Sequence, residues 1–97
     1  MTDQPLDRAV AAGQLRHALD AALGLPPADV DQIRVLIDAG ELRVALETLC
    51  TQAYEYDIEL SPAQREALQA LGDTLGVSVR YLLGDPWADT PSGNASQ

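Results

Sequence analysis

The stretch AYEYDIEL, residues 53–60, holds two tyrosines and three acidic residues. Carboxylates can serve as general acid and base, or they can pair with Arg and Lys of a partner. Tyrosine offers a rigid aromatic surface and a hydroxyl group at an interface. As a strand, this stretch would place its tyrosines on one face and its acids on the other. The chemistry available to it therefore depends on the elements that position it.

Cys50 and His17 are the only Cys and His in the chain, and so the only nucleophile–base pair of the Cys-His kind. Such a pair also needs close approach and an oxyanion hole. Cys50 falls at the margin of an apolar helical stripe, which favours core packing, and His17 lies beside another stripe, which favours a surface or packing role. The chain also lacks a phosphate-binding glycine loop, a Cys pair and a calcium-loop pattern. We predict no catalytic residue, no cofactor and no metal.

Apolar residues recur at helical spacing along most of the chain. Pro27 suits a first helical turn, Gly40 a helix end, and Ser61 with Gln64 a capping box, while Gly76 is a typical C-terminal glycine. These signals predict helices over residues 6–23, 27–39, 41–56, 61–75 and 78–83. No hairpin pattern is present. The predicted fold class is therefore all-α, a small bundle of four main helices plus a short C-terminal helix.

The chain of 97 residues predicts one helical domain over residues 1–87 and a disordered C-terminal tail over residues 88–97. Trp87 would close the end of the core or, less in keeping with tryptophan burial, form an exposed anchor. Neither a signal peptide nor a membrane-spanning segment is recognisable. With a single cysteine, these features predict a soluble cytoplasmic protein without membrane contact.

Helical projection separates the two tyrosines of residues 53–60. Tyr56 falls on the buried arc of the third helix, with Leu42, Leu49 and Ala53. Tyr54 falls outside that arc and in line with Glu47. It is predicted either to anchor an interface or to shield the edge of a helix-packing contact.

The acidic residues that follow conflict with the preferences of a helix end. Glu55 and Asp57 crowd a C-terminus that favours Lys or Arg, at an expected cost of about 0.3–1 kcal/mol each. Glu59 suits the positive start of the next helix. Acids that oppose the helix dipole, with no basic residue in the last turn to offset them, indicate a functional surface.

The net charge of −9 arises from fifteen acidic and six basic residues. It disfavours direct nucleic-acid binding and favours a basic partner. A purely solubilising role for this charge is the alternative.

The segment LIDAGELRVALETLCTQAYEYDIELSPAQREALQALGDTLGV, residues 36–77, resembles the core of the MafI family of immunity proteins. The likeness consists of a glycine-acid step, an ALE-x-LC helix, an acid- and tyrosine-rich corner and a Leu-Gly helix. The resemblance implies a polymorphic-toxin immunity protein of the kind found in contact-dependent growth inhibition. Such a protein is a non-enzymatic inhibitor of a secreted toxin domain, often a nuclease such as an EndoU-like ribonuclease.

The resemblance and the charge together predict a surface that masks a basic toxin cleft, although binding away from the toxin active site stays open. The predicted toxin-binding residues are Asp38, Glu41, Glu47, Tyr54, Glu55, Asp57 and Glu59. One alternative is an acidic helical adaptor or regulatory subunit that binds another protein. Another is a small enzyme that uses the carboxylates of residues 55–59, which five short helices rarely support with a cleft.

Overall fold

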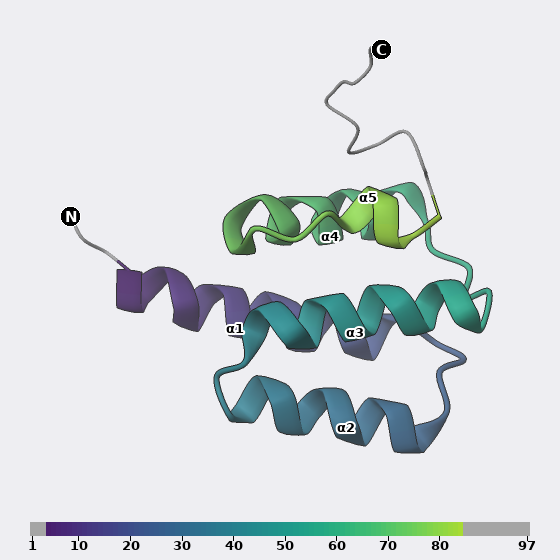
Figure 1. Cartoon of the computed structure of the whole chain (residues 1–97), viewed down its shortest axis with the longest axis horizontal. Helices are drawn as coiled ribbons and strands as arrows, with labels where there is room; N and C mark the ends of the chain where they lie inside the picture. The colour runs from purple at the N-terminus through teal and green to yellow at the C-terminus, as the bar shows by residue number, and fades with distance from the viewer. Residues whose placement is uncertain (1–3, 85–97) are drawn as a thin grey trace, which may run out of the picture.

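The computed structural model describes residues 4–84, with side chains from Arg8 onward, and these residues form five α-helices joined by short turns (Figure 1). The described residues include no strand. The all-α prediction, with four main helices and a short fifth, is confirmed. The helices are α1 (Gln4–Ala21), α2 (Pro27–Asp38), α3 (Leu42–Glu55), α4 (Pro62–Leu75) and α5 (Val79–Leu82).

Helix α3 occupies the centre of the bundle and contacts all four other helices. Helix α2 runs antiparallel beside it, so the start of α2 lies at the same end of the molecule as the end of α3 (Figure 1). Helix α4 packs on α1 and α3, and α5 packs on α3 and α4. The central helix therefore carries residues 53–60 to one end of the bundle.

The core is built on the apolar stripe of α3. Six residues of this helix are buried: Leu42, Ala45, Leu46, Leu49, Cys50 and Ala53. Leu15 of α1, Ile33 of α2 and Leu71 of α4 meet them and are each at most 2% exposed. Removing this apolar surface from water is the main stabilising term of the fold.

Two apolar residues of the predicted helix over residues 6–23 are exposed, although their spacing would place them on its apolar face. Val10 is 54% exposed because it faces an open groove between α1 and α4. Leu23 is 80% exposed because α1 ends at Ala21, two residues before it, and helical projection no longer applies.

The predicted capping box at the start of α4 is present. The Ser61 amide donates to the Gln64 side chain at 2.6 Å, and the Gln64 amide donates to the Ser61 hydroxyl at 3.1 Å. Gln64 also donates from Nε2 to the carbonyl of Ala21 at 2.9 Å. One side chain thus starts α4 and holds it to the end of α1.

Two exposed ion pairs link α1 to α2. Arg16 pairs with Asp38 at 2.5 Å, and Arg34 pairs with Asp20 at 2.9 Å. Arg8 adds a hydrogen bond to the carbonyl of Gly40 at 2.7 Å. Exposed pairs of this kind contribute about 0–1 kcal/mol each, so they orient the helices more than they stabilise them.

None of the helices in the described part of the chain is long and apolar enough to cross a bilayer. Trp87 and the predicted tail of residues 88–97 lie outside residues 4–84, as does the predicted domain boundary after residue 87.

Candidate functional site

The candidate site is the acidic corner, defined here as Tyr54, Glu55, Asp57 and Glu59. It forms where α3 ends and the chain turns towards α4. The Ile58 amide donates to the Ala53 carbonyl at 2.8 Å, and the Asp57 amide donates to the Tyr54 carbonyl at 3.1 Å. These two bonds define a Schellman motif, in which the chain reverses through one residue in the left-handed conformation.

Asp57 is that left-handed residue, with φ of 55°, and within residues 4–84 it is the one non-glycine residue with positive φ. A non-glycine residue in this conformation costs roughly 1–2 kcal/mol. Glycine fills the equivalent place after α2 and α4, at Gly40 and Gly76. Asp tolerates the left-handed conformation better than most side chains, but glycine does so without strain, so the turn does not require an acid at 57. Residual strain of this kind clusters at functional surfaces.

The apolar residues between the acids hold the corner in place. Leu60 is 9% exposed, and Ile58 is half-buried against the core. The Cδ1 atom of Ile58 also lies only 3.1 Å from where a side chain at Gly24 would begin. Ile58 and Leu60 therefore close the core at this end, and they leave Glu55, Asp57 and Glu59 exposed.

Tyr54 combines both roles that the sequence left open. Its ring lies against Gly84, just beyond α5, where an added Cβ would come within 2.6 Å of ring atom Cε1. The residue nevertheless stays 59% exposed. It therefore shields a packing edge and still presents an aromatic face to solvent.

The predicted burial of Tyr56 is wrong, because this residue is 49% exposed. The other three members of the predicted arc, Leu42, Leu49 and Ala53, are buried. Helix α3 ends at Glu55, and Tyr56 has left helical geometry with φ of −94° and ψ of 7°. Projection by 100° per residue consequently fails at this position.

Asp29, in the first turn of α2, lies beside the hydroxyl group of Tyr56. The pKa of Tyr56 is raised, first by a hydrogen bond to Asp29 and then by the negative charge of that residue. Desolvation and the charge of Glu55 raise it further. Asp29 Oδ2 is buried and has no hydrogen-bond partner. An acid in the first turn of α2 suits the positive start of that helix, and no local signal in the sequence places Asp29 next to the end of α3.

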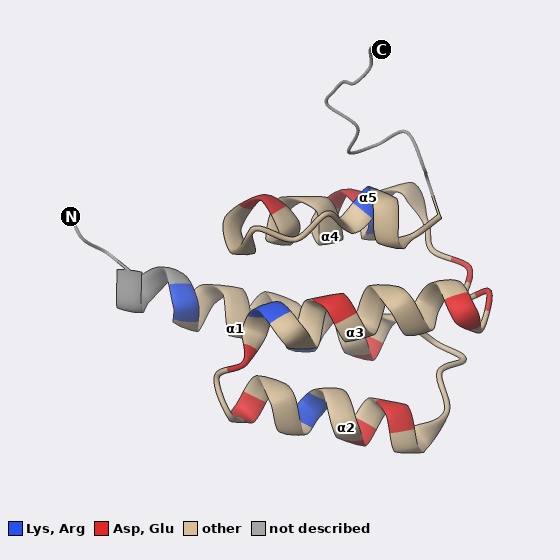
Figure 2. Ribbon diagram, viewed as in Figure 1, with Lys and Arg blue, Asp and Glu red and all other residues tan. Residues whose placement is uncertain are grey.

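Figure 2 shows the consequence of this arrangement. Acidic segments gather at the end of α3, in the loop to α4 and on the first turns of α2, all at one end of the molecule. Three ion pairs occur among the described residues, and none of them includes Glu55, Asp57 or Glu59. The acidic corner is thus a negative surface without a basic counterpart in residues 4–84.

The other three predicted toxin-binding residues do not extend this surface. Glu41 precedes α3 and is separated from Glu55 by the length of that helix, about 21 Å. Asp38 lies at the same far end and pairs with Arg16. Glu47 lies midway along α3, and its carboxylate is 3.8 Å from Arg43. The seven predicted residues therefore divide into a corner of four and three separate acids.

The reactive residues outside the corner do not assemble a second site. Burial raises the pKa of the Cys50 thiol from 9.0 to about 12, which keeps it protonated. His17 is exposed on α1. Within the described residues, no group of three or more His, Cys, Asp and Glu side chains could hold a metal ion.

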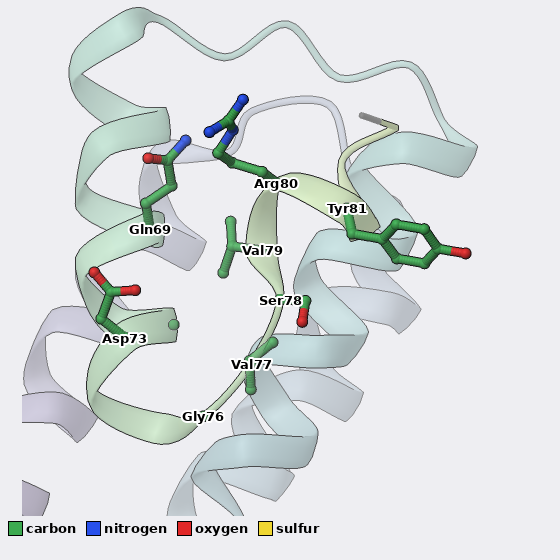
Figure 3. Close-up of a pocket in the computed structure, with 9 residues that line it drawn as sticks. Gln69, Asp73, Gly76, Val77, Ser78, Val79, Arg80 and Tyr81 are labelled. Carbon is green, nitrogen blue, oxygen red and sulfur yellow. The ribbon is translucent and has the colours of Figure 1, made fainter. Parts of the chain in front are cut away.

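A polar surface groove of about 460 Å³ is lined by residues of α4, of α5 and of the turn between them (Figure 3). The amide of Gln69 and the guanidinium of Arg80 lie towards the same side of it, while the ring of Tyr81 points away. Its two charged residues, Asp73 and Arg80, have opposite signs. The groove therefore has no strong preference for an anion or a cation. Tyr81 is 54% exposed and joins Tyr54 and Tyr56 as a third exposed tyrosine, which sequence reasoning did not single out.

No protein-family model, curated protein or solved structure gave a significant match to the chain. The resemblance to MafI immunity proteins stays a prediction from the residues quoted for it.

Proposed function

We propose that this chain is an immunity protein that binds and neutralises a cognate secreted toxin domain. The observation that carries the proposal is the acidic corner, whose three exposed acids have no ion-pair partner in residues 4–84. Such a surface favours a basic partner and accelerates association with it.

The toxin we propose is a nuclease, and an EndoU-like ribonuclease in particular. This choice follows from the resemblance and from charge, because a ribonuclease holds phosphates with Arg, Lys or His and the same cleft accepts carboxylates. Glu55, Asp57 and Glu59 would pair with those cations, and Tyr54 would supply the aromatic anchor.

The shape of the corner supports a binding role. Its backbone is fixed by the Schellman hydrogen bonds, and the Tyr54 ring is seated on Gly84. Preformed surfaces lose little conformational freedom on binding, which leaves more of the interaction energy as affinity.

The experiment is to purify the protein with the product of its neighbouring gene and to measure RNA cleavage by that product with and without it. We expect cleavage to stop at equimolar protein. A neighbouring product that is no toxin, or a toxin whose activity is unchanged, would overturn the proposal in favour of an adaptor.

The corner is tested with the double variant Glu55→Lys, Asp57→Lys. We expect it to lose several kcal/mol of affinity, since like charges then face each other across the interface. The matched control is Glu66→Lys, Asp73→Lys, which changes net charge equally at two exposed positions of α4 that were not predicted to bind the toxin. Equal loss in both variants would indicate a general charge effect and remove the corner from the interface.

A further inference from the structure

A second open surface lies between α1 and α4, and its lining residue Leu60 directly follows Glu59 of the acidic corner. It is a groove of about 610 Å³, and no residue of the corner lines it. Small side chains from both helices form its walls: Ala9, Gly13 and Ala21 on α1, and Ala63, Ala67 and Ala70 on α4. The buried side chains of Leu68 and Leu71 lie beneath it.

The spacing of these small residues suits the approach of another helix. Ala9, Gly13 and Ala21 are separated by multiples of four positions, and so are Ala63 and Ala67. Residues four apart form ridges on a helix surface, and a neighbouring helix packs along them. Small residues there allow a close approach, which makes the groove a seat for a helix rather than a pocket for a small polar molecule.

Gly13 is not required by the fold. It lies inside α1 with no positive φ, and an added Cβ would meet no atom within 4 Å. Glycine inside a helix costs roughly 0.5–1 kcal/mol relative to alanine. No backbone conformation or packing contact within the described residues requires glycine here. A helix that packs closely against the α1 backbone would require it.

The charges around the groove indicate the character of the occupant. Among the described residues, none of those lining it is Asp, Glu, Lys or Arg. Arg8 and Arg16 of α1 turn towards α2, where they bind the Gly40 carbonyl and Asp38. Exposed Glu66 lies three residues after Ala63 and four before Ala70, so it neighbours these two lining residues on the surface of α4. Exposed Glu59 directly precedes the lining residue Leu60, whereas Arg65 projects from another face of α4. The apolar groove thus has acidic residues along its α4 edge.

We propose that this groove binds an amphipathic helix of a partner protein, with a continuous apolar face flanked by Lys and Arg. The apolar face would fill the groove, and the flanking cations would meet the acidic residues along its α4 edge. A second copy of this chain fits less well, because each copy has a net charge of −9 and would bring the same acids to the contact. This docking surface goes beyond the proposed function and does not depend on it.

The probe is a synthetic peptide of about 18 residues, long enough for five helical turns, with Leu and Ala on one face and Lys on the other. Its control has the same composition in an order that breaks the apolar face. Titration calorimetry at about 0.15 M salt limits non-specific attraction between exposed charges. We expect binding of the first peptide and none of the second.

Groove-filling variants locate the site. Gly13→Leu and Ala67→Leu should each weaken binding of the first peptide at least tenfold, about 1.4 kcal/mol. Ala28→Leu is the matched control, since Ala28 is exposed on α2, away from the groove. Circular dichroism checks that each variant folds, and Gly13→Ala provides a smaller change that favours the helix.

Three outcomes would overturn the proposal. One is equal binding of both peptides, and another is full binding by Gly13→Leu and Ala67→Leu. The third is concentration-dependent dimerisation that Gly13→Leu abolishes, which would make a second copy the occupant.

Discussion

The ring of Tyr54 in α3 rests on the backbone of Gly84, so that a Cβ at Gly84 would lie 2.6 Å from ring Cε1. The exposed aromatic of the acidic corner is therefore oriented by Gly84, two residues beyond the end of α5. This contact links the short helix α5 to the surface that we propose for toxin binding.

Gly84→Ala should displace the Tyr54 ring and lower the stability of the fold. Gly84 has φ of 105°, so alanine there also introduces backbone strain. Gly76→Ala is the control, because Gly76 has φ of 75° but an added Cβ meets no atom within 4 Å. Both variants should lose roughly 1–2 kcal/mol from backbone strain. Only Gly84→Ala should shift the Tyr54 ring resonances and weaken toxin binding, and unchanged resonances would contradict the contact.

Gly72→Ala should destabilise the protein, because α5 approaches α4 at this glycine. An added Cβ would lie 2.5 Å from the Val77 carbonyl oxygen and 2.6 Å from Val79 Cγ2. Overpacking of this kind costs about 1–3 kcal/mol. Gly13→Ala, in open space on α1, should instead stabilise by about 0.5–1 kcal/mol. Urea unfolding of the two variants measures both effects, and changes of the same sign would refute the packing at Gly72.

Asp57→Gly should stabilise the free protein and weaken the proposed complex. Glycine removes the left-handed strain and an unfavourable charge at a helix C-terminus, for a gain of about 1 kcal/mol or more. Asp57→Asn separates the two effects, because it removes the charge while keeping a side chain at φ of 55°. Thermal unfolding and affinity are measured on the same samples. A less stable Asp57→Gly variant would show that the acid serves the fold instead.

The Cys50 thiol should resist labelling in the folded protein. Its burial should also make the free energy of unfolding fall at high pH. Its pKa rises from 9.0 to about 12 on burial, so the folded state favours the protonated thiol. The contribution of the protonated thiol to the free energy of unfolding is fully present below pH 9.0. It declines by about 1.4 kcal/mol per pH unit as pH rises towards 12. Cys50→Ala removes that slope, and the two unfolding curves are compared at each pH. Rapid thiol labelling of native protein at pH 8 would contradict the burial.

The elements whose signals are local were predictable from sequence. The Ser61–Gln64 capping box, the helix end at Gly40 and the buried position of Cys50 follow from spacing and residue type alone. The acidic corner was also predictable, because its acids conflict with the dipole of the helix on which they lie.

The features that were missed depend on contacts between distant segments. Tyr56 lies one residue beyond α3, where projection fails, and only the antiparallel packing of α2 brings Asp29 to it. The contact between the Tyr54 ring and Gly84 joins residues thirty positions apart in the sequence. A sequence pattern carries no information about which helix ends meet, so such pairs require the tertiary structure.

The hydrogen bond from Gln64 to the Ala21 carbonyl spans 43 positions of the chain and lies at the end that bears the acidic corner. Ile58 packs beside Gly24 at the same end. The α1–α2 turn and the α3–α4 loop are thus fastened together and would open as one cooperative unit in native-state hydrogen exchange. A partner that binds either segment would slow amide hydrogen exchange in both. Its binding would then be detected at backbone amides that it does not contact.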